Sequence, residues 1–197
     1  MLNATPAGPR GRVRGVTMIE VLIALFVLTV GMLGAANLQF RMQTAEREAY
    51  QRTQAIVLLQ DMVARINANR KNVADYATAA PLGTGATLDC SAPLTLAEQD
   101  RCAWHNALLG EGETSGGAQL GAMDGARGCI EVPVATMPRR VVVSVAWQGM
   151  SPTVSPGATA CGQGTYGSDD RFRRAMVASI TIGCLQNDPG TGICVTP

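Results

Sequence analysis

The chain has 197 residues, which is enough for one domain, and its formal net charge at pH 7 is +1. A chain so close to neutral lacks the large basic field that nucleic acid binding needs, so we expect no nucleic acid partner. Beyond one apolar segment near the N-terminus, the composition is rich in Gly, Ala, Thr and Ser with few aromatics, which allows only a modest core.

The N-terminal segment joins a short basic stretch to a long apolar run. Arg10, Arg12 and Arg14 stand just before the run, and residues 21–40 carry no charge. Twenty residues of helix span about 30 Å, the thickness of a bilayer core. Because cationic residues stay on the cytoplasmic side, the arginines predict a single-pass membrane protein whose remaining chain faces outward.

Three kinds of processing are compatible with this segment. One is an ordinary secretory signal cut ahead of Asn37, for which Gly34 and Ala36 supply small residues, and another is an uncleaved anchor. The third is a leader that is cut after Gly15. Glu20 favours the third, because a carboxylate in an apolar segment is costly in lipid and serves neither a signal peptide nor a plain anchor.

The stretch from Gly15 to Leu25 reads GVTMIEVLIAL and resembles the junction of type IV prepilins. In that family a glycine precedes the cut and a glutamate stands fifth in the mature chain, and Gly15 and Glu20 match these two positions. The resemblance implies cleavage by the inner-membrane prepilin peptidase and N-methylation of the new terminus, Val16. Most members begin the mature chain with Phe or Met, so Val16 is a departure that bears on methylation.

The resemblance also gives Glu20 a physical role. Cleavage leaves the amino group of Val16 as a positive charge near the membrane. The Glu20 carboxylate of a neighbouring subunit would neutralise this charge and set the axial register between subunits. The alternative is that Glu20 reaches the lipid surface from one turn inside the helix. The two arrangements belong to different stages, the membrane and the fibre.

The apolar run continues into a predicted helix over about residues 17–69. No proline occurs from 38 to 80, and apolar or small residues recur at helical spacing. These are Leu38, Met42, Ala45, Ala49, Ile56, Leu59, Val63 and Ile66. Gly31 and Gly34 lie inside this helix, where they would permit a bend or the close approach of another helix, or would simply be tolerated in a membrane span.

The remaining residues predict an α+β head, with a small antiparallel sheet against the C-terminal half of the long helix. Residues 71–93 indicate a loop, and a helix is predicted over 95–109, with Thr95 and Glu98 as its capping box. Residues 111–128 indicate irregular structure. Strands are predicted over 129–132, 140–147 and 174–183, with a loop over 149–170 and a tail loop over 184–194.

Six cysteines lie between positions 90 and 194, beyond the apolar segment, and indicate an oxidising compartment with up to three disulfides. Among fifteen arrangements we favour the local pairs Cys90–Cys102 and Cys184–Cys194, which leaves Cys129–Cys161. The alternative is that some are free buried thiols. The cysteines form no CxxC pair and His105 is the only histidine, so we expect neither zinc nor a redox site.

No arrangement of residues predicts catalysis or a cofactor, and we expect that the protein is not an enzyme. His105 is interpreted as a surface or core residue. Carboxylates at Asp169, Asp170 and Asp188 lack the spacing of a calcium site, so they are interpreted as solvated loop residues. A third group of polar residues, the arginines near the strand starts, is interpreted as salt-bridged strand edges. These arginines are Arg139, Arg140, Arg171, Arg173 and Arg174.

The order of long helix, variable region, small sheet and cysteine-bounded tail also resembles that of pilins. The amino-acid sequence of the helix is most similar to the PilV class of minor pilins. That class implies a subunit that primes type IV pilus assembly at or near the tip and supports adhesion and twitching motility. It implies as partners the prepilin peptidase, other minor pilins, the major pilin, the inner-membrane assembly platform and, before assembly, membrane lipid.

Four segments follow from this interpretation. They are a cleaved leader at 1–15, a transmembrane or filament-core half-helix at 16–40, an amphipathic half-helix at 41–70 and the head at 71–197. A pseudopilin of a type II secretion or DNA-uptake system remains an alternative, since it shares the junction and the helix. A secreted disulfide-rich binding protein with a conventional signal is the alternative from another class.

Overall fold

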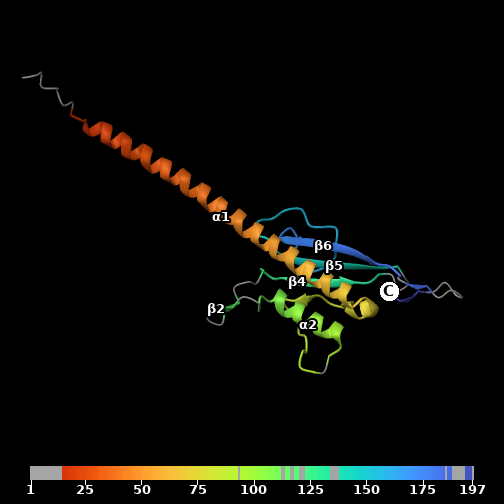
Figure 1. Cartoon of the computed structure of the whole chain (residues 1–197). Coiled ribbons are helices and arrows are strands. Elements are labelled where there is room, and N and C mark those ends of the chain that lie inside the picture. Colours follow the sequence, from red (N-terminus) through yellow and green to blue (C-terminus); the bar gives the residue numbers. More distant parts are fainter. Residues whose placement is uncertain are drawn as a thin grey trace, which may run out of the picture. The chain divides into compact units, whose positions relative to one another are not determined.

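The computed structural model describes residues 15–92, 94–111, 114–115, 118–119, 123–133, 138–184, 186–187 and 194–196 (Figure 1). The side chains of 114, 115, 118, 119, 187 and 194–196 also lie outside the description. The chain divides into two compact units, the first ending at Ala45 and the second beginning at Glu46. Each unit is described by itself, and the proposed leader falls outside the described residues except for Gly15.

The long helix α1 runs over Met18–Ala68, which is 51 residues, and continues without a break through Gly31 and Gly34. At its start the backbone N–H groups of Glu20 and Val21 both donate to the carbonyl of Thr17, at 3.1 and 3.3 Å. Glu20 lies in the first turn, where a carboxylate complements the positive end of the helix dipole. The helix agrees with the sequence prediction to within one residue at each end.

The second unit contains the rest of α1 and the head, which has an α+β fold. After α1 come the 3-10 helix η1 (Arg70–Tyr76) and the helix α2 (Leu96–Leu108). The main sheet has the strand order β1-β4-β5-β6 and is antiparallel throughout. Its strands are Leu82–Gly83, Arg127–Glu131, Arg139–Gln148 and Arg173–Ile182. Figure 1 shows β4, β5 and β6 side by side, with β6 outermost.

Two short hairpins complete the described elements. β2 (Thr114–Ser115) pairs with β3 (Ala118–Gln119), within a segment that was expected to be irregular. β7 (Gln186–Asn187) pairs with β8 (Cys194–Thr196), across the predicted tail loop.

One face of α1 meets the sheet and α2 in the main core. Ala55, Leu59, Met62 and Ile66 are buried at spacings of four, three and four, as a helix packed on one side requires. They belong to one cluster with residues of α2, β4, β5 and β6. Its buried members from these elements include Trp104, Leu108, Ile130, Val141, Val143, Val145 and Ile182. The predicted packing of the sheet on the C-terminal half of the helix is therefore confirmed.

The other face of the sheet is covered by the segment 149–172, which was predicted only as a loop. Cys161 and Tyr166 from this segment pack against Cys129 of β4 and Ala146 of β5 in a second buried cluster. As a result β5 is buried on both faces, and its residues 143–147 are buried one after another. Gly, Pro and Ser composition indicated a solvated loop, but the buried tyrosine and cysteine make this segment a layer of the fold.

The sequence prediction was wrong about residues 71–93, which are not loop throughout. They hold most of η1, and they hold β1, which adds a fourth strand to the predicted three-stranded meander. Gly83 has a positive φ of 91°, and a Cβ there would lie 2.5 Å from the carbonyl oxygen of Ala126. The glycine thus lets this two-residue strand approach β4 closely, a tertiary role that a turn-like sequence does not reveal.

Candidate functional site

The junction predicted for cleavage lies just outside α1. Gly15, Val16 and Thr17 precede the first helical residue, Met18, and all three are exposed. A Cβ added at Gly15 would meet nothing within 4 Å. The fold of this chain therefore places no demand for glycine at position 15, and any demand must come from a protein that binds the junction.

Glu20 stands five residues after Gly15, in the first turn of α1, and its side chain is exposed. In the part of the chain that the structure describes, no cationic group pairs with it. A carboxylate beside a long apolar surface and without a countercharge is available to a positive charge from elsewhere.

The apolar half of α1 has no packing partner among the described residues of its own unit. Large side chains from Val16, 69% exposed, to Met42, 56% exposed, face outward around the whole helix. The helix is long and apolar enough to cross a membrane, by length and composition. Its hydroxyls bond internally: Thr29 donates to the Phe26 carbonyl at 2.8 Å, and Thr44 does the same to Phe40 at 2.7 Å.

Two family models match the chain, and they adjoin each other. The prokaryotic N-terminal methylation motif matches residues 10–36, and the type IV pilin Tt1218 model matches residues 37–106. Over residues 10–106 the chain is therefore similar to type IV pilins that carry the prepilin methylation motif. No curated protein and no solved structure matches it.

The boundary between the two matches and the end of the second are informative. The methylation motif includes Gly15, Val16 and Glu20, the three residues singled out for processing and assembly. The pilin match takes in the second half of α1, η1 and most of α2. The sheet strands β4, β5 and β6 lie outside both matches, so the head after residue 106 is known from its structure alone.

Two disulfides join separate segments of the head. Cys90, in the loop before α2, is joined to Cys102 within α2, and Cys129 of β4 is joined to Cys161 of the covering segment. These are the pairings expected from the sequence. Cys184 is also disulfide-bonded, but the side chain of Cys194 lies outside the described residues, so the pair Cys184–Cys194 stays a prediction.

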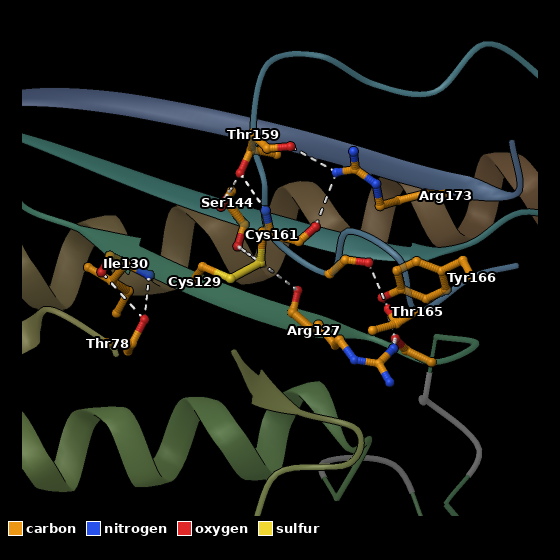
Figure 2. Close-up of a disulfide and its surroundings, with 12 residues drawn as sticks. Thr78, Arg127, Cys129, Ile130, Ser144, Thr159, Cys161, Thr165, Tyr166 and Arg173 are labelled. Atoms are coloured by element: carbon orange, nitrogen blue, oxygen red, sulfur yellow. Dashed lines mark hydrogen bonds between the residues drawn. A yellow bond between two sulfur atoms is a disulfide. The ribbon is translucent and has the colours of Figure 1, made fainter. Parts of the chain in front are cut away.

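A buried arginine fastens the covering segment beside the second of these disulfides (Figure 2). The side chain of Arg173 is 2% exposed and pairs with Asp170 at 3.0 Å. Its remaining donors reach the carbonyls of Thr159, Cys161 and Pro156 at 2.8, 3.2 and 2.8 Å. With its charge paired and its donors used, the arginine holds the segment to the start of β6.

Tyr166 is a second anchor of the covering segment. Its hydroxyl donates to the carbonyl of Gly125 at 2.7 Å, and the guanidinium of Arg127 lies 5.0 Å from its ring centre (Figure 2). Burial raises the pKa of Tyr166 above its ordinary value. Sequence reasoning missed both anchors, and the only available signals were an isolated tyrosine and an Asp-Asp-Arg-x-Arg run.

A polar cluster joins α1, η1 and α2 on the opposite side of the sheet from this segment. Asp100 of α2 accepts hydrogen bonds from Arg65 of α1, at 3.0 Å, and from the hydroxyl of Tyr76. Asn69 donates to the same hydroxyl at 3.2 Å, and Asp61 pairs with Arg65 at 3.0 Å. The predicted capping box of Thr95 and Glu98 is present at the start of α2.

The residues considered for chemistry have structural partners. His105 is buried, and its Nδ1 accepts the backbone N–H of Gly83 at 3.0 Å. Asp169 pairs with Arg171 at 3.8 Å on the surface, and Arg174 pairs with Glu48 of α1 at 3.4 Å. Three arginines near the strand starts are therefore salt-bridged, as interpreted from the sequence.

Two other questions from the sequence concern metal binding and Asp188. No group of three or more potential metal ligands occurs within the described ranges. Asp188 lies outside the described residues.

Proposed function

We propose that this chain is a minor pilin of the PilV type, which primes and joins type IV pilus assembly at or near the fibre tip. Adhesion and twitching motility then depend on it. The observation that carries the proposal is the exposed Glu20 carboxylate without a cationic partner in the described chain, five residues after the proposed cut. Chain length and cysteine number favour a minor pilin over the usually smaller pseudopilin.

The proposed route begins in the inner membrane, with the arginines of the leader in the cytoplasm and the head in the periplasm. The prepilin peptidase cuts after Gly15, and Val16 is then N-methylated. In the fibre, the new amino group meets a Glu20 carboxylate from a neighbouring subunit, so that neither charge stays unpaired in an apolar environment. The partners are other minor pilins, the major pilin and the assembly platform.

Mass spectrometry of the mature N-terminus tests the route. We expect a chain that begins at methylated Val16, and we expect Gly15→Leu to accumulate as the full-length precursor. Because nothing packs near Gly15, the variant should keep the thermal unfolding midpoint of the uncleaved wild-type chain. An intact leader in the wild-type protein, or a terminus at Asn37, would contradict the proposal.

Deletion of the gene separates pilus from secretion system. We expect fewer surface pili and reduced twitching, with normal release of exported enzymes. Normal pili together with blocked export would instead support the pseudopilin of a type II secretion system.

A further inference from the structure

The outer edge of β6 is a long, regular strand edge. All ten residues from Arg173 to Ile182 pair with β5 in one continuous antiparallel register. Within the described part of the chain, β5 is the only strand beside it, and β6 ends the sheet (Figure 1). Between Arg174 and Cys184 there is neither a charge nor a proline. Sheet edges in soluble proteins are commonly protected by lysine, proline or a bulge, and this edge has none of these.

An apolar groove lies beneath that edge. Met176, Val177, Ala178 and Ile180 of β6 line it from one side. Met176, Ala178 and Ile180 alternate along the strand, and they also pack against the main core. Ile56, Leu59, Gln60 and Val63 of α1 line the other side. The groove has a volume of about 260 Å³. Met176, Ala178 and Ile180 are two residues apart along β6. A neighbouring strand presents its side chains to one face of a sheet at the same spacing.

A second, charged hollow adjoins the groove at Met176, which lines both. It has a volume of about 410 Å³, and Trp147 and Ala175 contribute apolar surface to it. Its charged residues are Glu48, Arg52 and Arg174.

The charges in this hollow do not balance. The Glu48 carboxylate accepts from Arg174 at 3.4 Å and from the backbone N–H of Met150 and the hydroxyl of Ser151 at 3.2 and 3.3 Å. Arg52 is exposed and forms no ion pair with the residues that the structure describes. One positive charge is therefore in excess near the first residues of β6.

We propose that the outer edge of β6 is a docking site for an extended segment of another polypeptide, which adds to the sheet as a further strand. Its alternate apolar side chains enter the groove, and a carboxylate at one end meets Arg52. Main-chain hydrogen bonds supply the affinity in such strand addition, and the pockets for alternate side chains supply the specificity. The inference concerns the second unit alone, including its part of α1, and does not depend on the proposed function.

The charge decides between this occupant and the two that the chain itself offers. The β6 edge of a second copy is uncharged from residue 175 to 183 and brings no carboxylate to Arg52. The apolar half of α1 has its backbone groups bonded within the helix, so it offers no hydrogen bonds to a strand edge. An extended segment with an acidic end matches both the backbone edge and the excess charge.

The test uses the full chain in detergent micelles and a labelled ten-residue peptide of alternating valine and threonine that ends in two glutamates. Two further peptides carry N-methyl groups on one or the other set of alternate amides. We expect saturable binding by fluorescence anisotropy, and we expect one methylated peptide to lose more than about tenfold in affinity while the other binds like the parent. Each methylated peptide lacks the N–H donors of one strand edge. Only the peptide that lacks the donors facing β6 should therefore bind weakly.

A charge reversal tests the acidic end. Arg52→Glu should weaken the acidic peptide by about fivefold and strengthen a peptide ending in two lysines. Arg47→Glu is the matched control on the same helix, away from the groove, and should change neither. Three results would overturn the proposal: no saturable binding, equal effects of both methylated peptides, or equal effects of the two arginine variants. Binding that disappears as the protein self-associates would assign the edge to a second copy instead.

Discussion

At the scale of single residues, Tyr76 shows how the head uses a buried hydroxyl. The residue is 0% exposed, and its hydroxyl donates to Asp100 of α2. Burial, helped by this hydrogen bond, raises the pKa of Tyr76 to about 12 from an ordinary value of 10.0. The neutral form is therefore favoured in the folded state, and the resulting stabilisation is present below pH 10 and is lost as the pH rises towards 12.

We predict that Tyr76→Phe lowers the free energy of unfolding at pH 7 by about 1–2 kcal/mol, because Asp100 loses a buried donor. The variant should also lose less stability than the wild type between pH 10 and 12. Urea unfolding at pH 7 and at several values across that range measures both effects. Identical pH dependence of the two proteins would show that Tyr76 does not titrate in this way.

Sequence could predict some of these residue contacts and not others. The capping box of Thr95 and Glu98 is local, since both partners lie within one turn, and it was predicted correctly. The partners of Asp100 come from α1 and η1, which are 35 and 24 residues away. No spacing rule brings such residues together before the fold is known.

At the scale of elements, Gly128 sets the distance between β4 and α2. A Cβ at this position would lie 2.4 Å from the Trp104 ring and 2.7 Å from Leu108 Cδ1. Trp104 is fully buried, and its indole N–H donates to the Leu58 carbonyl of α1 at 2.9 Å. The ring is thus fixed between α1 and β4 and has little room to move.

We predict that Gly128→Ala destabilises the head by about 1–3 kcal/mol, because it overpacks a filled core. Gly157→Ala is the matched control, since a Cβ there meets nothing within 4 Å. Urea unfolding followed by tryptophan fluorescence should separate the two variants. Equal midpoints would mean that α2 can shift without cost.

Whether an element could be predicted depended on its length and on the regularity of its sequence pattern. α1, α2, β5 and β6 were predicted because each has a sustained helical or β-branched pattern, and β4 was predicted from a short run at 129–132. β1 was missed because two residues, Leu82 and Gly83, carry no period at all. The covering segment was misjudged because its composition suggested solvent, whereas Tyr166, Cys161 and Arg173 bind it to the sheet.

At the scale of the whole molecule, the proposed assembly depends on Glu20. We predict that Glu20→Gln leaves cleavage after Gly15 intact but lowers incorporation into the fibre by more than about tenfold, because an unpaired charge in an apolar contact costs several kcal/mol. Quantitative blotting of sheared pili against membranes measures incorporation. Glu46→Gln, an exposed carboxylate on the same helix, is the control and should assemble normally. Normal fibre content of the Glu20 variant would refute the pairing.

The bond from Thr29 to the Phe26 carbonyl has a consequence for how the subunit travels. From Val21 to Ala36, Thr29 is the one residue with a polar side chain, and its hydroxyl already has an acceptor in its own helix. In the proposed route, leaving lipid for the interior of a fibre therefore breaks and forms no side-chain hydrogen bond along this stretch. This transfer moves the helix from one apolar environment, lipid, to another, the packed helices of the fibre. Its free energy is therefore set by how well the shapes of neighbouring helices fit.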